Sequence, residues 1–375
     1  MQYKTLDSLC KVASGGTPSR SKKEYWDGGD IPWIKIGNIK SKVVSNADEY
    51  ITEAGLNNSS AKLFKKGTIL YTIFATLGEV GILDFDACTN QAIAGISIEK
   101  PEEITTDYLY YYLKSKKAEV NQIGRGVAQN NINLSILRKF SIPLRDIEDQ
   151  KTIVGSLNKV ESIIEKQKQQ LERLDELIKA RFVEMFGGSK TYPIKPLSDI
   201  AEYWNGLTYK PTDVSNDGTI VLRSSNIQNM QLDLNDIVRV KCEISNKKMV
   251  KKNDILMCSR NGSAKLVGKV ALIPNLQEQM SFGAFMMIIR SEYYSYLMTY
   301  FQLPEFRSQI STGTTTINQI TRYMLDKVKL PVPDKASIDE FAAFVAQVDK
   351  SKFAIQKSLE KTQLLFDSLM QEYFG

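Results

Sequence analysis

The chain has 375 residues, 42% of them hydrophobic and 25% charged, which is the composition of a soluble globular protein too long for one ordinary domain. Its formal charge of +6 and isoelectric point near 8.8 favour a polyanionic partner. Histidine is absent and the four cysteines form no CxxC pair, which argues against most hydrolases, zinc sites and disulfide frameworks. Without an apolar leader or a segment long enough to span a membrane, we expect a cytoplasmic protein.

Residues 1–147 form the first predicted domain. They carry short runs of β-branched and aromatic residues, interrupted by Gly, Asn and Pro, which predict strands and turns with a few helices. Pro143 lies just before the next element, at a place where proline would stop a strand. The pattern favours a mixed α/β domain.

Residues 148–187 are predicted to form a long helix. Apolar residues recur there in alternating steps of four and three, a coiled-coil spacing that is broken only at Gln167 and Arg181. The apolar positions of this first seam are Ile153, Leu157, Val160, Ile164, Leu171, Leu174, Ile178 and Met185.

Residues 188–336 repeat the first domain. EMFG, which ends at Gly187, returns as EYFG, which ends at Gly375, so the offset is 375 minus 187, or 188 residues. In the same order KKGTIL (65–70) returns as KKNDIL (251–256), and FSIPL (140–144) returns as VKLPV (328–332). The first of these matches is two residues off register and the second keeps the offset of 188. Matches in the same order at nearly the same offset indicate an internal duplication and therefore a second domain of the same mixed α/β kind.

Residues 337–375 are predicted to form the sister helix, which follows Pro331 and Pro333. The first seam shifted by the offset falls mostly on apolar residues, with polar breaks at Lys352 and Thr362. This second seam consists of Phe341, Val345, Val348, Ile355, Leu359, Phe366, Leu369 and Tyr373.

Each apolar seam needs a partner in water. Either each helix packs on its own domain, or the two helices pair with each other, antiparallel if a pseudo-two-fold axis relates the halves. Two copies at one offset favour mutual pairing. About 40 residues at about 1.5 Å each make a rod of roughly 60 Å, longer than one turn of B-DNA at about 34 Å, so such a spacer could hold two domains for a split site.

Several segments together resemble the specificity subunit of type I restriction-modification systems. They are LDSLCKVASGGTPSR (6–20), IPWIKIGNI (31–39), GTILYTIFATLGEVGIL (67–83), NQAIAGI (90–96) and GRGVAQNNIN (124–133), and the likeness covers essentially the whole chain. The second half departs from the pattern at WNGLTYK (204–210) and SFGAFMMII (281–289). This divergence is expected if the second half reads a different half-site.

The resemblance implies two target-recognition domains of mixed α/β structure, joined by two long antiparallel coiled-coil helices. It also implies a role without catalysis: the chain would bind double-stranded DNA with a split target site. It would dock two adenine methyltransferase subunits and, in the full complex, restriction and translocase subunits. S-adenosylmethionine, ATP and Mg would then be bound by those partners and no cofactor by this chain.

The residues give little support to chemistry in the chain itself. There is no Pro-Pro pair of a methyltransferase acceptor motif, no complete GxGxxG or GxxxxGK[ST], and no Glu-x-Lys of a nuclease. Asp84 and Asp86 are the nearest acidic pair, and a solvated turn explains them better than catalysis. We expect no catalytic residue and no metal site.

Candidate DNA contacts are polar residues concentrated in loops, because Arg and Lys pair with guanine, Asn and Gln pair with adenine, and small hydroxyls hold phosphates. In the first half they form three clusters: Thr17, Ser19 and Arg20; Lys35, Asn38 and Lys40; Arg125, Gln129, Asn130 and Asn131. In the second half they are Lys210, Arg223, Ser225, Asn226, Arg260, Asn261, Lys265, Thr314, Thr315, Thr316 and Asn318. The Arg223 group aligns with the Lys35 group, and the threonines align with the Gln129 group.

The structural alternative for any one of these residues is a helix cap or a merely solvated side chain. Asn131 and Asn133 precede a predicted helix and could be N-caps, and Gly15 and Gly16 could simply permit a turn. Trp33 and Trp204 are better explained as core residues than as base-stacking platforms.

We therefore expect a reader of bipartite DNA. The alternatives are the specificity subunit of a related type II-like methyltransferase or nuclease, a single-chain nuclease or methyltransferase, and a structural adapter without a DNA role. The bases read and the length of the gap depend on loop geometry and DNA shape, which residue types alone do not determine.

Overall fold

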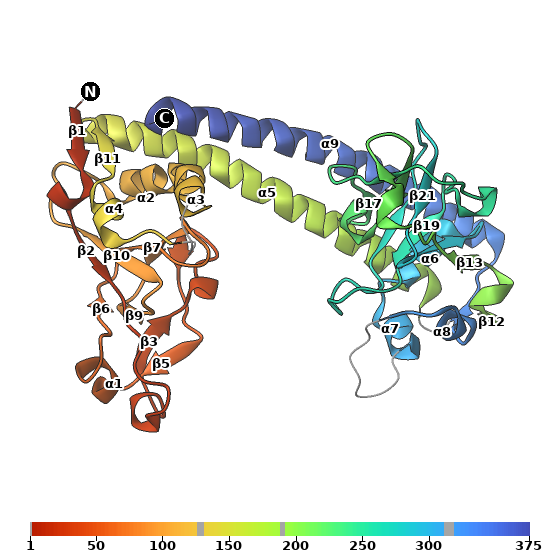
Figure 1. Cartoon of the computed structure of the whole chain (residues 1–375), viewed down its shortest axis with the longest axis horizontal. Helices are drawn as coiled ribbons and strands as arrows, with labels where there is room; N and C mark the ends of the chain where they lie inside the picture. Colours follow the sequence, from red (N-terminus) through yellow and green to blue (C-terminus); the bar gives the residue numbers. More distant parts are fainter. Residues whose placement is uncertain (1, 126–130, 188–191, 311–318) are drawn as a thin grey trace. The chain divides into compact units, whose positions relative to one another are not determined.

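The chain divides into two compact units, each with its own mixed α/β lobe (Figure 1). The structure, a computed structural model, describes residues 2–125, 131–187, 192–310 and 319–375. Unit 1 comprises Met1–Lys168 with Lys357–Gly375, and unit 2 comprises Gln169–Gln356. Both units contain part of each long helix. The fold class expected from the sequence is confirmed, while the domain boundaries stay a prediction because this division cuts through both helices.

The lobe of unit 1 is built on two sheets and a ribbon, mostly antiparallel. The five-stranded sheet runs β2 (Cys10–Ser14), β10 (Ile93–Ile98), β7 (Ile69–Thr72), β8 (Val80–Leu83), β4 (Val43–Val44). The four-stranded sheet runs β5 (Glu49–Ile51), β3 (Ile31–Ile34), β9 (Ala87–Thr89), β6 (Leu63–Phe64), and the ribbon pairs β1 (Gln2–Thr5) with β11 (Ser141–Leu144). Parallel pairing occurs between β3 and β9 and between β4 and β8.

The lobe of unit 2 repeats this plan. Its larger sheet runs β13 (Glu202–Asn205), β22 (Met286–Arg290), β19 (Ile255–Cys258), β20 (Val270–Leu272), β17 (Gln231–Leu232), β16 (Ile227–Gln228). The second sheet runs β14 (Val214–Ser215), β18 (Arg239–Val240), β15 (Thr219–Leu222), β21 (Met280–Phe282), and the ribbon pairs β12 (Ile194–Pro196) with β23 (Lys329–Pro331). The parallel pairs recur between β15 and β21 and between β17 and β20. The two lobes therefore share the same central strand order and differ at the sheet edges, where unit 2 has β14 and β16 and unit 1 has β6.

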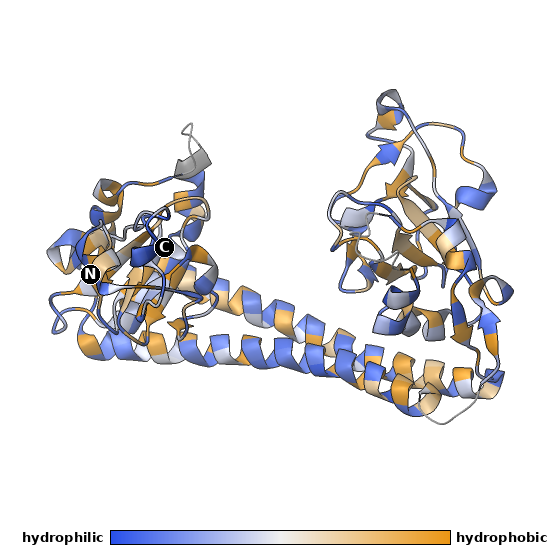
Figure 2. Cartoon of the chain, turned by 90° about the horizontal axis from the view of Figure 1, so that it is seen from below, coloured by the Kyte–Doolittle hydropathy of each residue, from blue (hydrophilic) through white to orange (hydrophobic). Residues whose placement is uncertain are grey.

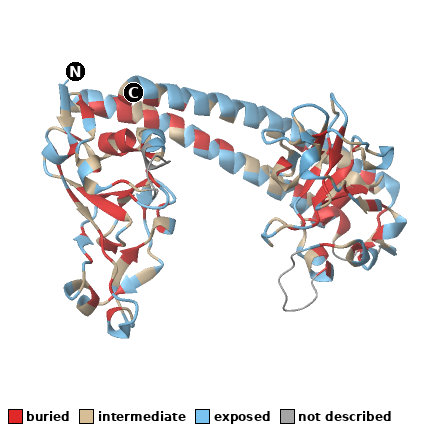
Figure 3. Cartoon of the chain, in the orientation of Figure 1, coloured by how far each residue is buried: buried red, intermediate tan, exposed pale blue. Residues whose placement is uncertain are grey.

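Short helices complete each lobe. Unit 1 has α1 (Glu53–Asn57), α2 (Thr106–Ser115), α3 (Lys117–Arg125) and α4 (Leu134–Arg138), and unit 2 has α6 (Tyr294–Tyr300), α7 (Pro304–Ile310) and α8 (Arg322–Asp326). Buried side chains from α2 and from α6 enter the main hydrophobic core of their own unit. The strands of both lobes are largely buried (Figure 3).

The duplication extends to backbone detail. Gly67 and Asn253 begin the same turn in the two lobes, and both have positive φ, 87° and 68°. Each donates its N–H to the end of the neighbouring strand, to Leu83 O at 2.8 Å and to Ile273 O at 2.9 Å. Glycine adopts this conformation freely and asparagine is among the few other residues that tolerate it, so the substitution preserves the turn.

Pro331 is the last residue of its strand, as the sequence had suggested, whereas Pro143 lies inside its strand and does not stop it. They belong to the ribbon strands β11 and β23. A proline is tolerated in an edge strand because the N–H group on its open side needs no partner in the sheet. Their carbonyls accept hydrogen bonds from the equivalent tyrosines Tyr108 and Tyr296, at 2.6 and 2.5 Å. The ribbon is thereby tied to the helix that covers it.

The long helices α5 (Ile147–Phe186) and α9 (Lys335–Phe374) have 40 residues each. Each begins at an aspartate that accepts a backbone N–H of the first turn: Asp146 from Asp149 at 2.8 Å, and Asp334 from Ser337 at 2.9 Å. These are N-cap interactions, which satisfy donors that have no partner within the helix. None of the described residues belongs to a helix both long and apolar enough to cross a membrane.

The two helices pack against each other within each unit. In unit 1, Ile153, Leu157 and Ile164 of α5 share a core with Phe366 and Phe374 of α9. In unit 2, Ile178 and Met185 share a core with Phe341 and Val348. Low-numbered residues of α5 meet high-numbered residues of α9, so the pairing is antiparallel. All residues of the two predicted seams are buried or half-buried, including Val160, Leu171, Leu174, Val345, Ile355, Leu359, Leu369 and Tyr373.

Three of the four polar breaks in the seams find partners on the other helix, and Thr362 donates to Ser358 O on its own helix at 2.8 Å. In unit 1, Gln167 donates to Ser358 Oγ at 2.8 Å. In unit 2, Lys352, whose side chain is 11% exposed, pairs with Asp175 at 2.6 Å, and Arg181 binds Glu340 at 2.7 Å. Away from this interface both helices carry mostly hydrophilic residues (Figure 2). The helices are thus stabilised by a narrow apolar seam with matched polar interruptions.

Candidate nucleic-acid interface

A cationic residue stands before the same buried turn in both lobes. Lys35 follows β3 and Arg223 follows β15, and a 3-10 turn comes next in each, Ile36–Asn38 and Ser224–Asn226. The backbone N–H of the cationic residue donates to the side chain of the turn's last residue, at 2.9 Å to Asn38 and 2.8 Å to Asn226. The alignment of these two groups that the sequence suggested is therefore present in the local geometry.

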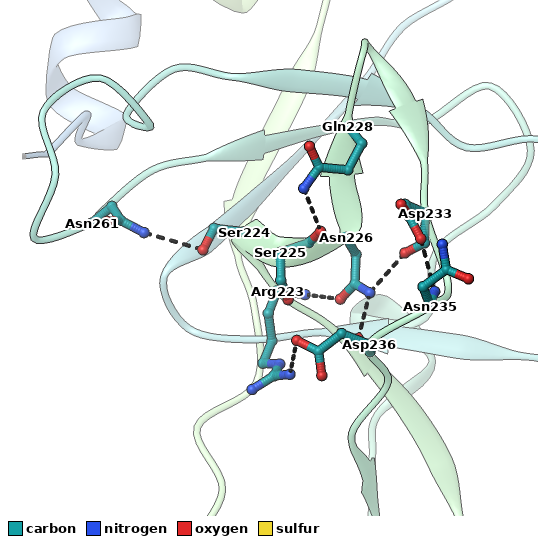
Figure 4. Close-up of polar contacts among 9 residues, drawn as sticks. All are labelled: Arg223, Ser224, Ser225, Asn226, Gln228, Asp233, Asn235, Asp236 and Asn261. Carbon is teal, nitrogen blue, oxygen red and sulfur yellow. Dashed lines mark hydrogen bonds and ion pairs between the residues drawn. The ribbon is translucent and has the colours of Figure 1, made fainter. Parts of the chain in front are cut away.

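Asn38 and Asn226 are buried and have a structural role, which does not favour the predicted contact with DNA. They are 7% and 0% exposed. Besides accepting from Arg223, the Asn226 side chain donates to the carbonyls of Asp233 and Asp236, both at 2.8 Å (Figure 4). An amide engaged in this way holds the turn in place and has no free group to offer a base.

In unit 1, Glu49 on β5 brings two predicted contact residues together. Its carboxylate pairs with Lys35 Nζ at 2.6 Å and with the Arg20 guanidinium at 2.5 Å. The guanidinium also lies 3.6 Å from the centre of the Trp26 ring, in cation–π geometry. The hydrogen bond from Lys35, followed by the one from Arg20, holds the pKa of Glu49 below its ordinary value. The result is an oriented pair of cations sharing one carboxylate.

Unit 2 has a corresponding arrangement around Arg223. Asp236 accepts from the Arg223 guanidinium at 2.9 Å, and Asn261 donates to Ser224 Oγ at 3.1 Å (Figure 4). The Nε of Arg223 and the Oγ of Ser225 are buried and have no hydrogen-bond partner among the residues that the structure describes. Buried polar groups are normally satisfied, so these two atoms mark a place suited to an incoming polar ligand.

A cavity of about 910 Å³ in unit 2 brings together four of the predicted contacts of that lobe. Arg223, Ser225, Arg260 and Asn261 all line it. The remaining wall includes Tyr209, Asp236 and Phe285, none of which the sequence had singled out. The cavity therefore combines two guanidinium groups, a carboxylate and aromatic surface, a mixture suited to base edges and phosphates.

The loop of Thr17 is held close to the start of β10 in unit 1. Thr17 is hydrogen-bonded to Gln91, and a Cβ added at Gly15 would lie 2.0 Å from Thr89 Oγ1. In unit 2 a Cβ at Gly206 would lie 2.1 Å from Phe282 O. Glycine is needed at both places for close backbone approach, and the interpretation of Gly15 as a residue that merely permits a turn is too weak.

Several structural alternatives raised by the sequence are confirmed. Trp33 is 2% exposed and donates to Gly16 O at 3.0 Å, so it is a core residue. Trp204 is half-buried and donates to Lys247 O at 2.9 Å. Asn133 caps α4 by accepting from Ile136 at 2.9 Å. Asp84 and Asp86 form ion pairs with lysines of the preceding turn, Lys66 and Lys65, both at 2.8 Å. That arrangement fits a solvated turn.

The other predicted contacts fall into two groups. Ser19, Lys40, Lys210 and Lys265 are exposed, while Asn131 is half-buried and pairs with Phe74 through an isolated β-bridge. The side chain of Arg125 and the residues Gln129, Asn130, Thr314, Thr315, Thr316 and Asn318 lie outside the described residues. DNA contact by both groups stays a prediction.

Sequence reasoning missed the acidic and aromatic members of the interface. Glu49 and Asp236 are acidic, so a search for DNA-binding residue types passes over them. Phe285 precedes a run of buried residues in β22, and its neighbours make it look like core. Only the duplication carried a usable signal, because it places Phe285 at a loop already known to differ between the halves.

Comparison with known proteins establishes the family. The family model described as "Type I restriction modification DNA specificity domain" matches residues 1–174 and 189–364, so the chain belongs to this family. A specificity subunit of the type I restriction enzyme MjaIX from Methanocaldococcus jannaschii is 35% identical over 188 residues, covering 49% of this chain and 43% of the relative. The chain thus aligns with less than half the length of the curated relatives it matches.

Two solved structures share the fold. The S subunit of a type I restriction-modification system from M. genitalium has a TM-score of 0.53 at 15% identity and covers 100% of this chain and 96% of its own. A structure from work on complex assembly and conformational transition of the type I R-M system has a TM-score of 0.58 at 16% identity, with coverages of 100% and 97%. At these identities the likeness concerns architecture, two α/β lobes with long helices.

Proposed function

We propose that this member of the specificity-domain family reads a bipartite DNA target, one half-site per lobe, and docks methyltransferase subunits on it. The observation that carries the proposal is the recurrence of one cation-bearing turn in two lobes with the same central strand order, with Lys35 in unit 1 and Arg223 in unit 2. Two readers of one evolutionary origin are expected to present corresponding loops to a groove. The curated relatives are named specificity subunits of type I restriction enzymes, which supports this role.

The role that we assign is recognition without catalysis. Adenine methylation and, in the full assembly, cleavage and translocation would belong to partner subunits, together with S-adenosylmethionine, ATP and Mg. Such a division fits a surface whose groups suit hydrogen bonding to bases and phosphates. A related type II-like methyltransferase or nuclease would use the same kind of reader.

Salt-dependent binding of the full chain to a randomised duplex library tests DNA recognition. Each phosphate neutralised by Lys or Arg lowers the logarithm of affinity by about 0.9 per tenfold increase in salt, so the affinity of a reader should fall steeply as salt rises. The library should also yield two conserved blocks separated by a gap. A flat salt response with no enriched sequence would support a structural adapter.

Adding the cognate methyltransferase tests whether this chain recognises DNA while a partner subunit carries out catalysis. Adenines in the selected sequence should become methylated when this chain and its cognate methyltransferase are present together, and methylation should fail with either one alone. Methylation or cleavage by the isolated chain, with S-adenosylmethionine or a divalent metal added, would favour the single-chain enzyme.

The helices should set the gap between the half-sites. Removal of one heptad from each helix at the same level, residues 168–174 and 351–357, keeps the seam in phase. It shortens each helix by about 10 Å, at about 1.5 Å per residue. At about 3.4 Å per base pair the gap should shrink by about three base pairs while both blocks keep their sequence. Altered bases at an unchanged gap would contradict this role.

A further inference from the structure

We propose that Phe74 in unit 1 and Phe285 in unit 2 each contact the methyl edge of a thymine, and so set the base preference at one position of each half-site. The inference rests on the proposed function and names residues for it. Phe74 is 42% exposed and Phe285 is 60% exposed. Among the phenylalanines that the structure describes, only Phe353, on α9, is comparably exposed, at 61%. The remaining ones belong to the cores or pack against them.

The two rings occupy the same corner of the two lobes. In unit 1, Ile73 N–H donates to Ala92 O at 2.8 Å, where the end of β7 meets the start of β10. In unit 2, the N–H groups of Ser259 and Arg260 donate to Phe285 O at 2.9 and 3.0 Å, where β19 meets β22. Ala92 and Phe285 therefore stand at equivalent positions.

A second set of contacts fixes the equivalence of Phe74 with Arg260. Phe74 forms a β-bridge with Asn131, and Arg260 forms the corresponding bridge with Gln319. The corner thus carries Phe74 beside Ala92 in one lobe and Arg260 beside Phe285 in the other. Each lobe presents one exposed phenylalanine there, but from opposite strands. Simple inheritance from the duplication would have kept the ring on the same strand.

The chemistry around Phe285 favours nucleic acid over an apolar partner. The Arg260 guanidinium lies 5.4 Å from the centre of the ring, and both residues line the cavity that also contains Arg223 and Asn261. A cavity wall that carries two guanidinium groups, an amide and the Asp236 carboxylate would be costly to bury in an apolar protein interface. The guanidinium and amide groups suit phosphates and base edges, between which an apolar surface can meet a thymine methyl.

Backbone conformation holds Phe74 at its corner. The next residue, Ala75, has φ of +60°, a left-handed conformation that is strained for a residue with a side chain. Such strain persists where the surrounding structure imposes it, and it gathers at functional positions. Thr76, the residue after, accepts from the side chain of Thr72, which closes the loop back on β7. The ring is therefore displayed on a constrained loop.

A phenyl ring cannot hydrogen-bond, so it can distinguish bases only through apolar contact. In the major groove thymine alone presents a C5-methyl group. Burial of one such group contributes about 0.8 kcal/mol, or roughly fourfold in affinity. Replacement of the ring by a methyl group should remove this preference and spare neighbouring positions. Because the two rings belong to different lobes, their effects should fall in different half-sites.

The test is binding selection from a randomised duplex library with the full chain, its Phe74→Ala and Phe285→Ala variants, and Phe353→Ala as a matched control. We expect each of the first two variants to lose about fourfold of the preference for thymine at one position, in opposite blocks. The control should reproduce the wild-type profile. Deoxyuridine at the affected position, which removes only the methyl group, should weaken wild-type binding several-fold and leave the corresponding variant unaffected.

Unchanged profiles for both interface variants would overturn the inference, as would a uniform loss of affinity without a change in preference, or a lost preference for a base other than thymine. Phe74→Leu and Phe285→Leu, which keep apolar surface, should retain part of the preference. Complete loss of the preference for thymine in these leucine variants would also count against the inference. If the wild-type chain enriches no sequence at all, the proposed function itself fails, which is a distinguishable result.

Discussion

The ion pair between Asp254 and Arg290 in unit 2 should be a local determinant of stability. Asp254 Oδ1 and Oδ2 accept from Arg290 Nε and Nη2, both at 2.7 Å, and Oδ2 also accepts from the Lys251 backbone N–H at 2.7 Å. The Asp254 side chain is 1% exposed and that of Arg290 is 30% exposed. The equivalent place in unit 1 holds a neutral contact, Thr68 with Ser97 at 3.3 Å.

Asp254→Ala should destabilise unit 2 by about 3 kcal/mol. Breaking a buried ion pair from one side costs about 3–5 kcal/mol because it strands the other charge. We expect the lower end of this range, since water reaches part of the Arg290 guanidinium. The value of about 3 kcal/mol also covers the loss of the acceptor for the Lys251 N–H. We add no separate cost for it, because this backbone group can rotate towards solvent.

Native-state hydrogen exchange followed by mass spectrometry measures this effect unit by unit. A loss of about 3 kcal/mol corresponds to about 100-fold faster exchange, at about 1.4 kcal/mol per tenfold, for amides that exchange through opening of unit 2. The amides of β19 and β22 report on unit 2, and those of β7 and β10 serve as the internal reference. Glu278→Ala removes the more exposed pair with Arg239 and should change the same rates by less than about threefold. Similar rates in both variants would refute the reasoning.

Further predictions concern Glu49 and the cysteines. Glu49→Gln frees Arg20 and Lys35 from their shared carboxylate, so binding to non-specific duplex should tighten and its salt dependence should steepen, as judged by titration at two salt concentrations; equal binding would contradict this. The hydrogen bond from Lys35, ahead of the one from Arg20, lowers the pKa of Glu49 in the folded protein. The ionised Glu49 carboxylate should therefore contribute to stability at any pH above its ordinary pKa of about 4.3. This contribution should be lost only as the pH falls through the lower pKa of the folded state. Burial raises the pKa of Cys10 to about 12 and that of Cys88 to about 11, and it also raises that of Cys258. An alkylating reagent at pH 8 should therefore label the half-buried Cys242 first, and peptide mapping that finds all four thiols labelled at one rate would count against it.

The duplication and the helices were accessible from the sequence because each leaves a periodic trace. A repeat at one offset survives divergence of individual residues, and an apolar seam must recur at coiled-coil spacing wherever two helices pair. The conserved turn at Gly67 and Asn253 could be aligned in the same way. By contrast, the position of Pro143 inside a strand depended on its being at an edge, which local sequence does not encode.

The composition of the interface was only partly predictable. Residue type suggested Arg20, Lys35 and Arg223, and the structure brings these beside carboxylates that no base-reading rule would select. Asn38 and Asn226 have residue types suited to adenine, but in the structure they are buried and accept hydrogen bonds from the backbone N–H groups of Lys35 and Arg223. Long-range pairing of strands decides which polar side chains reach the surface, and a pattern of residue types carries no record of that pairing.

From its sequence alone the chain was determined to be a duplicated α/β protein with two long helices of matching seams, because periodicity and repetition are one-dimensional properties. Only the tertiary structure showed that Glu49 pairs with Arg20 and Lys35. It also showed that Asn38 and Asn226 are buried and that Phe74 and Phe285 are exposed at the same corner of the two lobes. These features join residues far apart in the chain, and their burial or exposure depends on what packs over them, a three-dimensional property.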